Sequence, residues 1–190
     1  MINLNILAIS RVENIIIFVN AYLILIAVII FISLRSYKSH KKKKMFLAVE
    51  ELLNEYVAAD PLYSKLEKSS VKEYDYILTT KEIKVYIMII PNFHQGEICI
   101  NSPTKWQFRK TYQDSSSRFV PRVDRLMRFE PPMEAGLRIK RLYIVYPSSK
   151  SLLRYINECE MEFVRPETDL NGCSVITYSF LLEHKDSIEL

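Results

Sequence analysis

Glycine, cysteine and histidine are each represented by only three residues in this 190-residue chain. So few glycines argue against a glycine-rich phosphate-binding loop, and the sequence contains no Walker, GxGxxG, GxSxG or HExxH motif. The cysteines Cys99, Cys159 and Cys173 are odd in number, widely spaced and without a CxxC pair. We therefore expect reduced thiols and no disulfide framework.

Charged side chains are absent from residues 15–34, which read IIIFVNAYLILIAVIIFISL. Twenty residues in a helix span about 30 Å, the thickness of the hydrocarbon core of a bilayer. A cleaved signal peptide would have a shorter apolar region followed by small residues, whereas LRSYKSHKKKK follows here. The segment therefore predicts one transmembrane helix. Its polar Asn20 could hydrogen-bond a second helix or lie hydrated near the outer interface.

A dense basic cluster follows the apolar segment. Its six members are Arg35, Lys38, Lys41, Lys42, Lys43 and Lys44. Before the segment, Arg11 and Glu13 cancel. The positive-inside rule then places the C-terminal side in the cytoplasm, with a short N-terminal tail outside. The same cluster could contact anionic lipid headgroups.

The basic cluster also explains the net charge of the chain, which is +4 with a pI of about 8.8. Residues 45–190 hold 19 Lys and Arg against 21 Asp and Glu, so that part is close to neutral. The basic pI therefore indicates a membrane-proximal cluster and not a basic nucleic-acid-binding domain. Expected partners are the lipid bilayer, anionic headgroups, and a protein partner or a second copy of the chain; nucleic acid is less favoured.

We divide the chain into four parts, at 1–14 (extracytoplasmic tail), 15–34 (transmembrane helix), 35–44 (polybasic linker) and 45–185 (cytoplasmic domain). Apolar spacing predicts a helix over 45–59, which could continue from the membrane as a stalk, and Asp60-Pro61 ends it. Three strands are expected next, at 73–79, 83–90 and 97–102. The run IKVYIMII at 83–90 is apolar on both faces and predicts a central, doubly covered strand.

The second half of the domain begins with the irregular, basic segment 103–140, where we expect a short helix or loop. After it we expect a strand, a helix capped by Ser148-Ser149, a short strand, and a last strand or strand–helix junction, over 141–146, 150–160, 161–164 and 173–180. Together these elements predict an α+β (mixed α/β) domain whose mixed sheet is flanked by helices.

The order helix, three strands, connector, strand and helix over residues 45–165, with Asp75 in an apolar strand, resembles the core of restriction-endonuclease-like (PD-D/ExK) nucleases. The resemblance implies that Asp75 and Glu97 hold a divalent metal such as Mg²⁺ and that a lysine, here a displaced Lys105 or Lys84, stabilises the developing charge. Cys99 stands where that family has its lysine, so the resemblance implies a degenerate site. The competing interpretation is that Asp75 and Glu97 are ordinary strand-end charges facing water.

Residues 105–141 mix basic and aromatic side chains. Arg109, Lys110, Arg118 and Arg122 could contact phosphates, and single-stranded nucleic acid is held by such mixtures. The interleaved aromatics are Trp106, Phe108, Tyr112, Phe119 and Phe129. The alternatives are a solvated loop or a face lying on anionic lipid. His94 has no second histidine nearby, which argues against a zinc site.

From these patterns we expect a single-pass membrane protein whose cytoplasmic domain is a non-catalytic binding or assembly module without a cofactor. The alternative is a membrane-tethered nuclease-like domain, active or degenerate, which alone would need a divalent metal.

Overall fold

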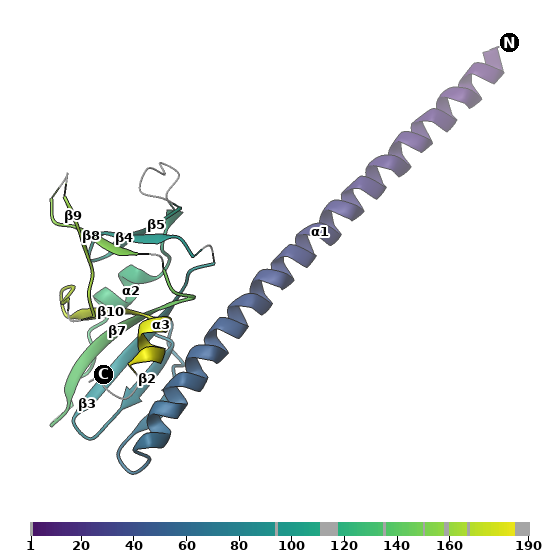
Figure 1. Ribbon diagram of the computed structural model, residues 1–190. Coiled ribbons are helices and arrows are strands. Elements are labelled where there is room, and N and C mark those ends of the chain that lie inside the picture. The colour runs from purple at the N-terminus through teal and green to yellow at the C-terminus, as the bar shows by residue number, and fades with distance from the viewer. Residues whose placement is uncertain are drawn as a thin grey trace. The chain divides into compact units, whose positions relative to one another are not determined.

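The computed structural model describes residues 2–93, 95–110, 118–134, 136–149, 151–157, 160–166 and 168–184, with side chains described from Ile16 onward. A long, apolar N-terminal helix is followed by an α+β domain with two mixed five-stranded sheets (Figure 1). By internal contacts the chain divides into two compact units, Met1–Lys44 and Met45–Leu190. The helix therefore contributes residues to both units.

Helix α1 runs without a break from Ile2 to Ala59, so the helix expected over 45–59 continues from the apolar segment through the lysines. Its last turns belong to the domain, where Met45, Val49, Leu52 and Leu53 are buried. The predicted helix over 45–59 is confirmed. It ends before Asp60-Pro61, because a proline disfavours helical backbone at the residue that precedes it.

The first sheet contains the central strand of the domain. Its strands, in spatial order, are β1 (Lys65–Lys68), β2 (Tyr76–Thr79), β3 (Ile83–Pro91), β7 (Arg138–Tyr146) and β10 (Cys173–Thr177). The β1–β2–β3 pairs are antiparallel, whereas β3, β7 and β10 run parallel. Strand β3 is the middle one and is buried over most of its length, as its apolar run predicts.

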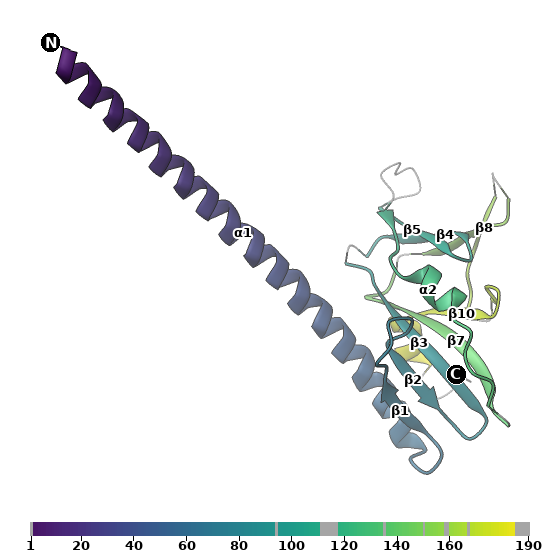
Figure 2. The same cartoon turned by 180° about the vertical axis from the view of Figure 1, so that it is seen from behind.

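The second sheet covers one face of the first. Its strands, in spatial order, are β6 (Arg118–Phe119), β5 (Lys105–Arg109), β4 (Glu97–Ser102), β8 (Leu152–Tyr155) and β9 (Met161–Phe163). Only the β4–β8 pair is parallel. Two short helices complete the domain, α2 (Val123–Arg128) and α3 (Tyr178–Glu183). Figures 1 and 2 show α2 between the two sheets.

Two hydrophobic cores lie on opposite faces of β3, because successive strand residues point to opposite sides. Tyr86, Met88 and Ile90 enter a core shared with the second sheet and α2. Val85, Ile87 and Ile89 enter the other core, which α1 and α3 close from the far side; its helical members include Val49, Leu52, Leu53 and Leu181. The first sheet is thus covered on both faces.

The expectations from sequence are corrected at four points. The helix predicted over 150–160 is wrong for its described residues, where β8 pairs in parallel with β4 through Ile98 and Leu152. Segment 103–140 contains α2, as expected, but also the unpredicted strands β5 and β6. Strand β1 was not predicted, and the domain has two sheets where we expected one.

Candidate functional site

The surface of α1 between Ile16 and Leu34 is apolar on every side. Its large side chains are mostly more than half exposed, for example Phe18 at 75%, Ile17 at 63% and Phe31 at 64%. No part of its apolar window is buried within the chain. Among the described residues, this is the one helix whose length and composition would allow it to cross a membrane. A helix that is apolar all round needs lipid or protein around it, so α1 is consistent with a single membrane anchor or a signal sequence.

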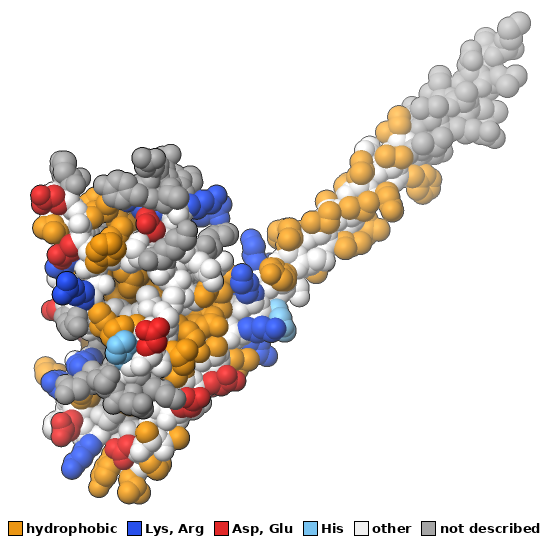
Figure 3. All heavy atoms as spheres, in the orientation of Figure 1, with side chains coloured by type: hydrophobic (Ala, Val, Ile, Leu, Met, Phe, Trp, Pro, Cys, Tyr) orange, Lys and Arg blue, Asp and Glu red, His pale blue; other side chains and the backbone are white. Residues whose placement is uncertain are grey.

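The basic cluster occupies the next turns of the same helix. Five of its six side chains are exposed and Lys41 is half-buried. Figure 3 shows hydrophobic side chains along the described helix and basic ones where they end. At the rise of an α-helix, Leu34 and Lys44 are about 15 Å apart. The cluster therefore lies within reach of headgroups if residues 15–34 span a bilayer.

The domain end of α1 also makes polar contacts. Tyr76 Oη in β2 donates a hydrogen bond to Glu50 Oε2 at 2.9 Å, and Lys68 Nζ lies 3.4 Å from the same oxygen. Burial, followed by the hydrogen bond to Glu50, raises the pKa of Tyr76. Residues 45–59 are therefore an integral part of the domain, through both apolar and polar contacts.

Asp75, the first proposed catalytic carboxylate, holds the start of β2 in place. Its Oδ2 accepts a hydrogen bond from the backbone N–H of Ile89 at 2.8 Å, and its Oδ1 lies 3.0 Å from Arg122 Nη1. Arg122 Nη2 also donates to the Lys72 carbonyl at 2.7 Å. The strand expected from 73 begins only at Tyr76. At Asp75 the backbone carbonyl accepts from Ser69 N–H at 2.9 Å, and the side chain, not the backbone, accepts the Ile89 N–H of β3.

The other two proposed catalytic residues lie on the second sheet. Glu97 opens β4, and its Oε2 is buried without a hydrogen-bond partner. Lys105 is exposed at the start of β5. The described His, Cys, Asp and Glu side chains include no group of three that could hold a metal ion. The catalytic assignment of Asp75, Glu97 and Lys105 stays a prediction.

The residues proposed to contact phosphate have different surroundings. Arg122 is engaged by Asp75, and Arg109 Nη1 lies over Cys99 Sγ and Met161 Sδ at 3.9 and 3.8 Å. Arg118 begins β6 and Lys110 follows β5. Of the interleaved aromatics, Trp106, Phe108 and Phe129 pack in or against the core, Phe119 is exposed, and Tyr112 lies outside the described residues. Most of these aromatic rings are therefore unavailable for stacking on bases.

The remaining candidates are His94 and the three cysteines, of which some are buried and the others lie outside the described residues. His94 and Cys159 belong to the latter group. Cys99 and Cys173 are free and buried. Burial raises the pKa of the Cys173 thiol to about 11. Burial likewise raises the pKa of Cys99.

The pair Ser148-Ser149 was expected to cap a helix starting near residue 150, but Ser148 contacts α3. Ser148 Oγ accepts a hydrogen bond from the Ser179 backbone N–H at 2.9 Å, and Thr177 Oγ1 accepts one from Phe180 N–H at 3.2 Å. Ser149 Oγ donates to the Gly96 carbonyl at 2.8 Å. Both serines therefore join loops and helix ends of the fold, which agrees with a structural role.

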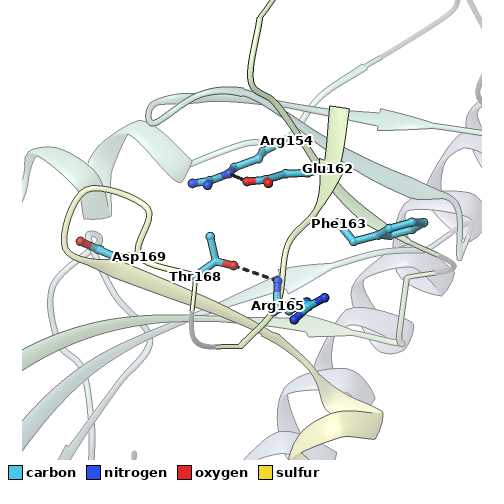
Figure 4. Close-up of a pocket in the computed structure, with 6 residues that line it drawn as sticks. All are labelled: Arg154, Glu162, Phe163, Arg165, Thr168 and Asp169. Atoms are coloured by element: carbon cyan, nitrogen blue, oxygen red, sulfur yellow. Dashed lines mark hydrogen bonds and ion pairs between the residues drawn. The ribbon is translucent and has the colours of Figure 1, made fainter. Parts of the chain in front are cut away.

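One open cleft of about 750 Å³ lies between β8, β9 and the turn after β9. Its lining residues are Arg154, Glu162, Phe163, Arg165, Thr168 and Asp169. Figure 4 shows Arg154 paired with Glu162, while Phe163, Arg165 and Asp169 point away from that pair. Two basic and two acidic residues line the cleft without converging on a common point, so it defines no ligand chemistry.

The described features define a class of architecture: one long apolar N-terminal helix, consistent with a single membrane anchor, joined to an α+β domain. Comparisons with known protein families, curated proteins and solved structures find no match.

The sequence did not predict the interactions of Asp75 with Arg122 and Ile89. It also did not predict the outer face of the second sheet. Both depend on pairings between segments that are distant in the sequence.

Proposed function

We propose that the chain is a single-pass membrane protein whose domain is held at the cytoplasmic face of the cell membrane as a non-catalytic binding or assembly module. The observation that carries this proposal is the continuity of α1, in which an apolar segment, the basic cluster and a core-forming segment follow one another within one unbroken helix. In this proposal, the same helix that enters the core of the domain also spans the membrane at residues 15–34.

The proposed orientation follows from charge. Six basic side chains come after the apolar segment, and one basic and one acidic side chain come shortly before it. Basic residues near the end of a membrane helix favour the cytoplasmic side. The N-terminal tail of residues 1–14 would then be outside, and the domain from Met45 onward would be inside.

A binding or assembly role is supported by how the domain uses its candidate catalytic groups. Asp75 is engaged in an ion pair and a backbone hydrogen bond, Ser148 and Ser149 bond to backbone groups, and the described thiols are buried. The near-neutral charge of the domain also suits contact with protein better than contact with nucleic acid. The partner is a second protein or a second copy of this chain.

The experiment combines cross-linking with a hydrolysis assay on the full chain. Lysine-directed cross-linking in native membranes should give a discrete adduct of the chain with its partner. Leu53→Asp should remove this adduct, because it disrupts the core to which α1 contributes. The control Leu47→Asp, on the exposed side of the same helix, should keep the adduct. Purified chain with Mg²⁺ or Mn²⁺ should not cleave DNA or RNA. Metal-dependent cleavage that Asp75→Asn abolishes would instead establish the nuclease alternative.

A further inference from the structure

The outer face of the second sheet consists of the side chains that point away from the core between the two sheets. One row crosses all five strands in register, and its members are Phe119, Gln107, Cys99, Leu153 and Phe163. Residues directly opposite one another share a face of a sheet. The alternate residues Ile98, Trp106 and Leu152 face the core, which identifies this row as the outward one.

This outer face carries exposed aromatic side chains at both edges of the sheet. Phe119 on β6 is 66% exposed and Phe163 on β9 is 70% exposed. Between them, Cys99 and Leu153 are buried, and Met161 Sδ lies 3.7 Å from Cys99 Sγ. Within the domain from Met45, α2 packs in the core on the other side of this sheet, and α3 and the end of α1 pack in the core beyond the first sheet. Two exposed phenylalanine rings therefore stand at the ends of this strip of outward-facing residues, whose middle members are half-buried or buried.

Basic side chains accompany this strip on β5. Lys105 is exposed at the start of the strand, and Arg109 at its end reaches across the face to Cys99 and Met161. By strand alternation, Glu97 is the one acidic residue on this face among the described strands. The domain as a whole is near neutral, so the excess of positive charge here is local. Aromatic rings beside basic groups are the composition that adheres to a negatively charged bilayer surface.

We propose that the outer face of the second sheet contacts the anionic headgroup layer of the membrane that holds α1, with Phe119 and Phe163 reaching toward the acyl boundary. This inference rests on the proposed function, since it needs the anchor. The domain begins at Met45, about 16 Å along the helix from Leu34, so the headgroup layer is the surface within reach of the domain. The charge of the face fits phosphatidylserine or another anionic lipid.

The test uses the full chain in vesicles of phosphatidylcholine, with or without phosphatidylserine, that carry a spin-labelled headgroup lipid. Phe163→Trp supplies the reporter, since the natural Trp106 is 1% exposed and gives a constant background. The emission of the introduced indole should be quenched in anionic vesicles and much less in neutral ones. Leu62→Trp, at a position 85% exposed in the turn after α1, is the matched control and should not be quenched.

Charge variants make the test specific. Lys105→Gln in the Phe163→Trp background should lower the ratio of docked to undocked domain about fivefold, the effect of one cation near an anionic surface, whereas Lys72→Gln should leave it unchanged. A reporter indole that stays unquenched in both bilayers would overturn the inference and leave the face to a protein partner. Flotation with the vesicles measures separately whether the apolar helix anchors the chain. A chain that fails to float contradicts the proposed function. A chain that floats without quenching contradicts this inference alone.

Discussion

At the scale of single residues, Asp75 shows how a possible catalytic group can have a structural role. Its carboxylate accepts the Ile89 N–H and pairs with Arg122, whose backbone has a positive φ of 70° just before α2. A non-glycine residue in that conformation needs support from its surroundings. Asp75 thus connects the start of β2, the middle of β3 and the start of α2.

Replacing Asp75 should therefore change stability in a graded way. Asp75→Ala should lower the free energy of unfolding by about 2 kcal/mol, because it leaves the Ile89 N–H and the Arg122 guanidinium without their acceptor. Asp75→Asn keeps an oxygen for the N–H and should cost about half as much. Urea unfolding of the full chain in detergent, followed by the emission of the buried Trp106, measures both. If Arg122→Ala adds its full cost on top of Asp75→Ala, the two residues are not coupled as described.

The thiol of Cys173 should titrate at unusually high pH. Burial raises its pKa to about 11 from an ordinary value of 9.0. Between these values the unfolded thiol loses its proton while the folded one keeps it, so this group's contribution to stability, complete below pH 9, is lost as the pH rises toward 11. Alkylation mapped by mass spectrometry should follow a pKa near 11 in the folded chain and near 9 in urea. A reactive Cys173 at neutral pH would contradict its burial.

At the scale of elements, local patterns predicted the segments whose apolar spacing suits only one structure. The helix over 45–59, the doubly covered strand at 83–90 and the strand at 97–102 are all present. The sequence around Leu152–Tyr155 suits a helix as well as a strand, and pairing with β4 and β9 decides for a strand. Strand β1, Lys-Leu-Glu-Lys, has little apolar signal, which is usual for an edge strand.

The candidate site was predictable to a different extent. The apolar run and the lysines are contiguous in sequence, so the long apolar helix and the basic cluster could be identified from it. The outer face of the second sheet combines β5, β6 and β9 from distant segments, and no local pattern shows which strands share a face. The same limit applies to the ion pair of Asp75 with Arg122, which are 47 residues apart.

The end of α1 should behave as part of the domain core. Leu53 is fully buried, whereas Leu47 on the same helix is 44% exposed. Leu53→Ala should cost about 2–5 kcal/mol of unfolding free energy, through lost burial and the cavity that remains. Leu47→Ala should change it by no more than about 0.5 kcal/mol. Equal effects in the Trp106 unfolding assay would show that α1 does not pack against the first sheet in this register.

At the scale of the whole molecule, charge and hydrophobicity are separated along the chain. The exposed apolar residues of 16–34 come first, the basic cluster of 35–44 follows, and a near-neutral domain from Met45 completes the chain. In the proposed arrangement each part meets its own surroundings, namely hydrocarbon, headgroups and cytoplasm. One helix, α1, contains both the apolar segment and the first buried residues of the domain.

The most direct test of this account is the accessibility, to a membrane-impermeant thiol reagent, of two variants that each introduce one additional cysteine. Asn5→Cys should be labelled in intact cells, whereas Leu62→Cys should be labelled only after the cells are permeabilised, each measured against the labelling of the unaltered chain. That pattern requires residues 15–34 to cross the membrane with the domain inside. Labelling of Leu62→Cys in intact cells, or of neither variant before permeabilisation, would contradict the account.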